Sequence, residues 1–123
     1  MKYEWLDQYC LSKKCAEKDF KIDWEAVRYL IGGKMFAMQG GDKYKKSIIT
    51  LKCKPELGQA LRNQYEHIIP GYYMNKQHWN SVYLEGDVPD DVLKQMIDMS
   101  YELALSSFSK KMQKEILQVD KND

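Results

Sequence analysis

The sequence predicts an α+β domain in which a small antiparallel sheet carries helices on one face. Three runs rich in β-forming residues, 26–31, 34–39 and 47–53, follow one another through short connections, which favours an antiparallel meander. Segments with apolar residues at helical spacing stand before and after these runs. The expected order of elements is therefore α-β-β-β-α-β-α, in a chain of 123 residues that suits a single core.

The first half of the chain is expected to contain one helix and the meander. Residues 3–13 place their apolar and aromatic side chains on one side of a helix. Residues 14–23 are rich in charge and are expected to form a connector. Gly32-Gly33 predicts a tight turn between the first two strands, because glycine accepts positive φ. A looser turn over 40–46 leads into the third strand.

The second half is expected to contain two helices and a fourth strand. Pro55 begins the first of these helices, because proline is preferred in the first helical turn. The chain then turns at 68–71, and 79–84 alternates as a strand. Pro89-Asp90-Asp91 begins the most regular helix, with acids where the helix dipole favours them. Serines at 106, 107 and 109 interrupt it, so we predict a domain over 1–108 and a helical extension or polar tail over 109–123.

Composition indicates a globular protein in a reducing compartment. Hydrophobic residues make up 44% of the chain and charged residues 30%, as in ordinary globular domains. No apolar run reaches the roughly 18 residues that a membrane span needs, and the first residues do not form the apolar core of a signal peptide. The three cysteines lack paired spacing and are expected to be free thiols. We predict a cytoplasmic monomer with no membrane partner.

Charge is distributed unevenly along the chain. The net charge of +1 alone does not indicate a nucleic-acid partner, because non-specific DNA binders are usually basic overall. However, lysines dominate residues 32–54, and acids dominate residues 85–102. This pattern fits a polarised molecule with a binding surface, and it fits two solvated faces of opposite sign equally well.

Residues 70–84, with the sequence PGYYMNKQHWNSVYL, are the most informative segment. They combine aromatic, amide, lysine and histidine side chains in an expected loop that leads into a strand. Loops held by a rigid scaffold often carry binding groups. Rings beside amide and ammonium donors suit a nucleic acid or a flat ligand. Because no nucleophile is paired with a base, the segment indicates recognition without catalysis.

Three segments carry a family resemblance: IGGKMFA at 31–37, LKCKPEL at 51–57, and the segment 70–84. Residues 88–93 and 98–103 continue it. The chain resembles the MmcQ/YjbR family over roughly residues 3–108. The resemblance implies a frataxin-like (CyaY-like) α+β fold, described as a double-wing DNA-binding fold. Tyr73 stands where the family commonly has histidine, which weakens any histidine-dependent or metal role for the loop.

The first functional hypothesis is a DNA-binding protein that contacts the backbone through lysine-bearing hairpins and the 75–80 loop. It requires the hairpin ends and the loop to share one exposed surface. Lysines supply charge, and amides donate to base edges or backbone oxygens. The structural alternative is solvated turns and side chains that bond the backbone of a long turn. The predicted DNA-binding residues are Lys34, Lys43, Lys45, Lys46, Asn75, Lys76, His78 and Asn80.

The alternative function is a non-catalytic protein that binds a planar metabolite or drug. The predicted stacking residues are Tyr72, Tyr73 and Trp79, although Trp79 also suits a core position. A third hypothesis is a protein-interaction module that uses the acidic helix face over 90–102. Histidines and cysteines lack zinc spacing, acids in the first helix are sparse, and no catalytic motif occurs. We therefore predict no catalytic residue, no metal and no cofactor.

Overall fold

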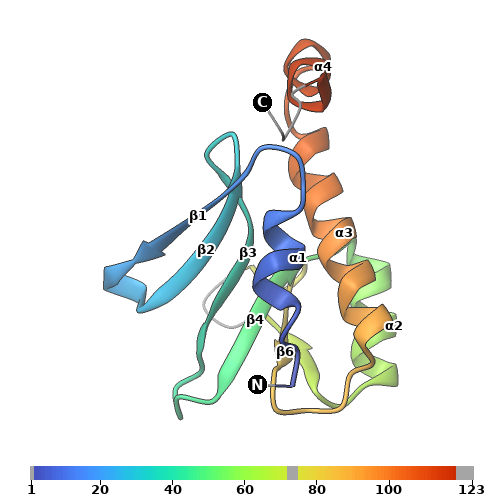
Figure 1. Cartoon of the computed structure of the whole chain (residues 1–123). Helices are drawn as coiled ribbons and strands as arrows, with labels where there is room; N and C mark the ends of the chain where they lie inside the picture. The colour runs from blue at the N-terminus through green and yellow to red at the C-terminus, as the bar shows by residue number, and fades with distance from the viewer. Residues whose placement is uncertain (1, 72–74, 119–123) are drawn as a thin grey trace.

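A computed structural model describes residues 2–71 and 75–118 and has a six-stranded antiparallel sheet with helices against one face (Figure 1). The spatial order of the strands is β1-β2-β3-β4-β6-β5. The strands are β1 (Ala16–Lys21), β2 (Ala26–Ile31), β3 (Lys34–Gly41), β4 (Ser47–Lys52), β5 (Ile68–Pro70) and β6 (Trp79–Tyr83). The helices are α1 (Leu6–Leu11), η1 (Ile22–Trp24), α2 (Pro55–Gln64), α3 (Asp90–Ser106) and α4 (Lys110–Gln118). The predicted α+β class is confirmed.

The core lies between the sheet and the helices α1 and α3. Alternate residues of the central strands point to this side, and Tyr29, Ile49 and Leu51 are among those fully or almost fully buried. Leu93 and Ile97 of α3 lie one turn apart and are both fully buried. The apolar side of α3 that the sequence predicted therefore faces the sheet, and no helix of residues 2–71 or 75–118 covers the other face of the sheet (Figure 1).

A serine of α3 joins the two central strands where their pairing ends. The β2–β3 register shifts between Tyr29 and Leu30, which leaves Phe36 as an extra residue on β3. The β3–β4 pairing ends at Ala37 and Leu51. Beyond this pair, the Lys52 N–H donates to Ser100 Oγ at 2.9 Å, and the Ser100 hydroxyl donates to the Phe36 carbonyl at 2.5 Å. The serine hydroxyl thus takes the place of a ladder hydrogen bond.

The expected order of elements lacked the two strands at the edges of the sheet. β1 occupies the region where charge indicated a connector, and its four central residues are exposed. Strands are recognised in a sequence by alternating apolar and polar residues, and an exposed strand of this kind lacks that alternation. β5 contains only three residues and ends at Pro70, which lacks an N–H for further pairing.

The serine-rich segment after α3 separates two helices. α3 ends at Ser106 and α4 begins at Lys110. Ser109 Oγ accepts a hydrogen bond from the Met112 N–H at 3.1 Å, which satisfies one of the free donors in the first turn of α4. Within the described part of the chain, no helix is both long and apolar enough to cross a bilayer.

Candidate functional site

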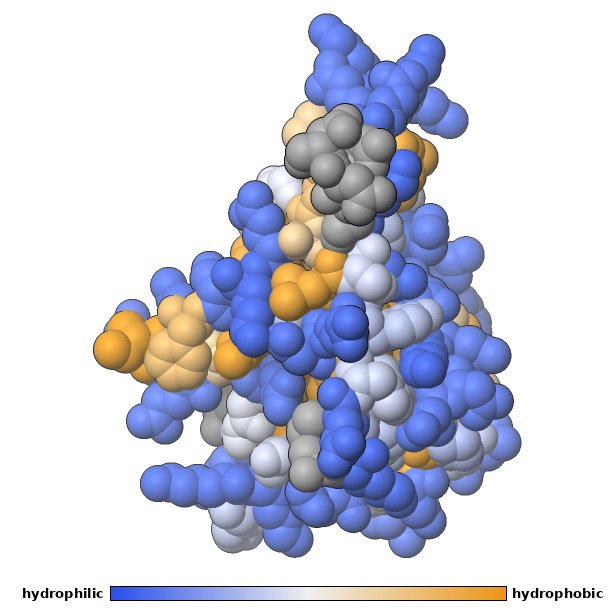
Figure 2. All heavy atoms as spheres, in the orientation of Figure 1, coloured by the Kyte–Doolittle hydropathy of each residue, from blue (hydrophilic) through white to orange (hydrophobic). Residues whose placement is uncertain are grey.

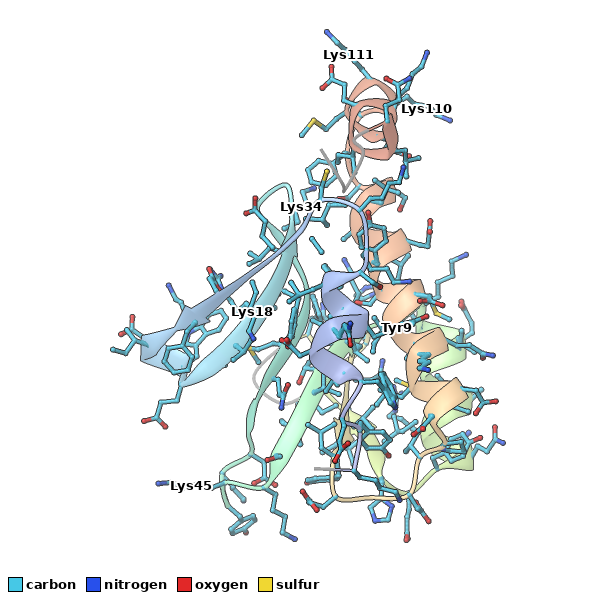
Figure 3. The ribbon with its side chains drawn as sticks, viewed as in Figure 1. Tyr9, Lys18, Lys34, Lys45, Lys110 and Lys111 are labelled. Carbon is cyan, nitrogen blue, oxygen red and sulfur yellow. The ribbon has the colours of Figure 1, made fainter. Side chains whose placement is uncertain are left out.

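The lysine-bearing turns lie at opposite ends of the sheet. Lys34 stands at the β2–β3 turn, whereas Lys45 stands at the β3–β4 turn, and β3 runs the length between them (Figure 3). Its eight residues separate the two turns by roughly 25 Å. Successive turns of an antiparallel meander alternate between the ends of the strands. The two turns were expected to share one surface, and this expectation is wrong. Lys34 lies at the opposite end of β3 from Lys43, Lys45 and Lys46.

The loop before β6 lies away from the β3–β4 turn. The His78 carbonyl accepts a hydrogen bond from the Cys53 N–H at 2.7 Å, and Trp79 pairs with Lys52 at the far end of β4. Lys76 is exposed in this loop, whereas His78 and Trp79 are half-buried. The loop residues and the Lys43–Lys46 turn consequently do not form one surface. Tyr72 and Tyr73, predicted as stacking residues, lie outside the described residues.

Several residues of the 70–84 segment have structural roles. Asn75 Oδ1 accepts from the Gln77 N–H at 2.9 Å, and the Asn75 carbonyl accepts from the Trp79 N–H at 2.9 Å. Asn75 thus closes an Asx-type turn. Asn80 is fully buried, and its Oδ1 accepts from the Arg62 guanidinium of α2. A buried side chain cannot reach a DNA base, so Asn80 has a structural role and not the predicted role in DNA binding.

Five lysines from three segments gather around α4. Lys34 Nζ lies 4.7 Å from the centre of the Phe108 ring and 2.7 Å from Ser107 Oγ, at the corner between α3 and α4. Lys14 Nζ donates to the Leu117 carbonyl at the other end of α4, at 2.7 Å. We call the following set the basic pole: Lys14, Lys34, Lys110, Lys111 and Lys114.

The basic pole is exposed and rich in unneutralised charge. Lys34, Lys110 and Lys111 lie toward the α4 end of the molecule, far from Lys45 (Figure 3). Hydrophilic residues project into solvent from this end (Figure 2). No lysine of the basic pole forms an ion pair with a carboxylate of residues 2–71 or 75–118. Of its members, only Lys34 was predicted from the sequence. Lys110, Lys111 and Lys114 are neighbours along the chain, and folding brings Lys14 and Lys34 to them.

Asp42 organises the β3–β4 turn. Its Oδ1 accepts from the Tyr44 and Lys46 N–H groups at 2.8 and 2.9 Å, and its Oδ2 accepts from the Tyr83 hydroxyl at 3.2 Å. Burial of the carboxyl acts to raise its pKa, but these hydrogen bonds and the charge of Lys46 outweigh burial and hold the pKa below its ordinary value. The carboxylate thus fixes the turn that presents Lys43 and Lys45.

We expect Asp42→Asn to remove part of the acid sensitivity of the protein. Because the pKa of Asp42 is lowered on folding, its carboxylate stabilises the folded state above the unfolded value of 3.8. That contribution is lost as the pH falls through the lowered pKa. Urea unfolding at neutral and acidic pH should show a smaller acid-induced loss in Asp42→Asn than in the wild type. An equal loss in both proteins would contradict this role, and Tyr83→Phe, which removes one donor, should give an intermediate loss.

Burial keeps two of the three thiols protonated. Cys10, Cys15 and Cys53 are all free. Burial raises the pKa of Cys10 to about 12 and that of Cys53 to about 11, so neither is a thiolate at neutral pH. Among the residues that the structure describes, no group of three histidine, cysteine or acidic side chains is arranged to hold a metal ion.

A family model and two related proteins show which family this chain belongs to. The YjbR family model matches residues 11–103, most of the chain. The chain belongs to the YjbR family. It is 33% identical over 114 residues to uncharacterized protein YjbR of Escherichia coli K12, covering 93% of this chain and 96% of that protein. It is 45% identical over 56 residues to uncharacterized protein YyaQ of Bacillus subtilis strain 168, covering 46% and 47% of the two chains.

Solved structures with the same fold support this membership. A crystal structure of Deinococcus radiodurans protein DR2400, with a DUF419 domain, superposes with a TM-score of 0.82 at 31% identity, covering 94% of this chain and 87% of that one. A crystal structure of a Pseudomonas syringae protein gives a TM-score of 0.72 at 26% identity, covering 85% and 99%. The resemblance to the MmcQ/YjbR family is thereby confirmed. The range matched to the YjbR family ends before α4, which carries three lysines of the basic pole.

Proposed function

We propose that this YjbR-family protein is a monomeric, non-catalytic DNA-binding protein whose basic pole contacts the phosphate backbone. The observation that carries the proposal is the gathering of five exposed lysines from three separate segments at one end of the molecule. Lysines that neutralise phosphates release counterions, which supplies affinity without sequence recognition. A local concentration of this kind offsets the near-neutral net charge of the whole chain.

The position of two of these lysines supports a binding role. Lys110 and Lys111 occupy the first turn of α4, which contains no acidic residue. The helix dipole disfavours cations there, so the stability of α4 does not explain their presence. An approaching phosphate experiences the opposite effect, because the same end of the helix attracts negative charge.

α4 is attached firmly enough to present its lysines from a defined surface. Ile116 is only 4% exposed and belongs to the main core. Gln113 Nε2 donates to the Phe108 carbonyl at 2.8 Å. At the opposite end of the helix, Lys14 Nζ donates to the Leu117 carbonyl. The free thiols also fit a protein of the reducing cytoplasm, where a DNA partner would be met.

We expect the triple variant Lys110→Gln, Lys111→Gln, Lys114→Gln to lose DNA affinity by about tenfold or more, because up to three phosphate contacts disappear. Fluorescence anisotropy with a labelled duplex of about 20 bp, titrated between about 50 and 200 mM salt, measures both affinity and salt dependence. The slope of log affinity against log salt should become shallower by up to about 3, at roughly 0.9 per phosphate contact.

The matched control removes the same charge from the opposite end of the sheet. Lys43→Gln, Lys45→Gln, Lys46→Gln should leave affinity and slope close to the wild type. If this control loses binding while the α4 variant keeps it, the β3–β4 turn is the contact surface and the basic pole is not. Absence of wild-type binding to duplex at the lowest salt would overturn the DNA-binding function itself. Preferential binding to anionic lipid vesicles over duplex would also overturn it.

A further inference from the structure

A hollow of about 750 Å³ opens between two hairpin ends, on the face of the sheet opposite to α1 and α3. The β1–β2 connection forms one wall with Asp23, Trp24 and Glu25, and the β3–β4 turn forms the other with residues 41–43 and 45. In Figure 1 these two hairpin ends stand at the left and at the bottom of the sheet. The size lies within the range of sites for small organic ligands, roughly 300–1,000 Å³.

The floor and one wall of the hollow suit a flat aromatic group. Met38 and Ile48 lie at the floor of the hollow and are 5% and 1% exposed, so the floor is apolar and already closely packed. Trp24 is 51% exposed although it is a large aromatic residue. Lys21 Nζ lies 5.7 Å and Arg28 Cζ 5.9 Å from the centre of its ring, within the range of cation–π contacts. These contacts hold the indole in place before any ligand arrives.

The two walls carry opposite charge. Lys43 and Lys45 line the side formed by the β3–β4 turn, whereas Asp23 and Glu25 line the side formed by the β1–β2 connection. Asp42 also lines the hollow, but its carboxylate already accepts hydrogen bonds from the turn and from Tyr83. Lys21 and Arg28 also lie near the acidic wall, against the Trp24 ring, but neither lines the hollow, and Arg28 pairs with Asp19. The side chains that line the hollow therefore form a dipole, with cations at one end and carboxylates at the other.

From this arrangement we infer that the hollow binds a planar aromatic zwitterion. Its ring stacks on Trp24 over the Met38–Ile48 floor, its acidic group lies toward Lys45, and its cationic group lies toward Asp23 and Glu25. A compound with one charge complements the charge of only one of the two walls. This site is distant from Trp79, where stacking was predicted from the sequence, and it is independent of the basic pole.

Isothermal titration with 6-amidino-2-naphthoate tests the inference, because this probe carries a carboxylate and an amidinium at opposite ends of a planar ring system. The matched probes are 2-naphthoate and 2-naphthamidine, which each keep one charge. We expect the zwitterion to bind at least about tenfold more tightly than either singly charged probe. Equal affinity for all three probes, or no binding of the zwitterion at millimolar concentration, would overturn the inference.

Variants locate the binding within the hollow. Trp24→Leu should weaken binding of the zwitterion by about tenfold or more, and Lys45→Gln should remove most of its advantage over 2-naphthamidine. Phe20→Leu is the matched control, because Phe20 is an aromatic residue of the same hairpin, is 60% exposed and does not line the hollow. Unchanged binding in Trp24→Leu, or an equal loss in Phe20→Leu, would show that the probe binds elsewhere.

Discussion

Replacing Ser100 by alanine should lower the free energy of unfolding by about 2–5 kcal/mol, because it removes the partner of one buried and one partly buried main-chain group. Ser100 is 1% exposed, and its hydroxyl links the Lys52 N–H of β4 to the Phe36 carbonyl of β3. No neighbouring strand residue takes its place, since the β3–β4 pairing ends at Ala37 and Leu51. Urea unfolding measures the loss, and hydrogen exchange should show reduced protection of the Lys52 amide.

The matched control is Ser106→Ala on the same helix. Ser106 is exposed, and its hydroxyl donates to the Leu103 carbonyl within α3 at 3.0 Å. Its replacement should change stability by no more than about 0.5 kcal/mol, as is usual for surface positions. Equal effects of the two substitutions would contradict the role of Ser100 as the link between the strands.

Gly71→Ala should destabilise the protein by about 2–3 kcal/mol through crowding of β6. A Cβ at Gly71 would lie 2.7 Å from both the Cβ and the main-chain oxygen of Trp79. The two residues already approach closely, since the Gly71 N–H donates to the Trp79 carbonyl at 2.6 Å. Because the crowded atoms belong to the main chain or are attached to it directly, rotation of a side chain does not relieve the contact. Thermal or urea unfolding measures the effect.

Gly33→Ala provides the comparison for Gly71→Ala. Gly33 has a φ of +82°, and a Cβ there would meet nothing within 4 Å. Its replacement should therefore cost only the backbone strain of an L-residue in this region, about 1 kcal/mol. If Gly33→Ala proved more damaging than Gly71→Ala, backbone conformation and not crowding would determine the role of these glycines.

The 70–84 segment shows how a distinctive sequence can have a structural explanation. Its density of aromatic and amide residues indicated a binding loop, but the structure assigns main-chain roles to Gly71 and Asn75 and a buried role to Asn80. The sequence alone did not distinguish these alternatives, because an asparagine that closes a turn and an asparagine that binds a ligand have the same side chain. For Asn75 the hydrogen bond to the Gln77 N–H identifies the structural role, and for Asn80 burial and the contact with Arg62 of α2 do so.

The two edge strands show a different limit. β1 is exposed along most of its length and β5 contains three residues, so neither has the apolar period by which strands are recognised. β1 forms because β2 offers it a row of hydrogen-bonding groups, with six residue pairs in register. Pairing of this kind involves the main chain, which every residue shares, and therefore leaves little trace in the sequence.

Local pattern by itself determined the α+β class, the central strands, the main helices and the family of this protein, because apolar spacing and turn residues act between near neighbours in the chain. Only the tertiary structure decided which lysines lie together and where a ligand could enter. Lys14, Lys34 and α4 meet because the termini of several elements lie at one end of the sheet, and Trp24 faces Lys45 because two hairpins end on the same side. Distances of this kind depend on how strands pair and helices pack, and no spacing along the chain encodes them directly.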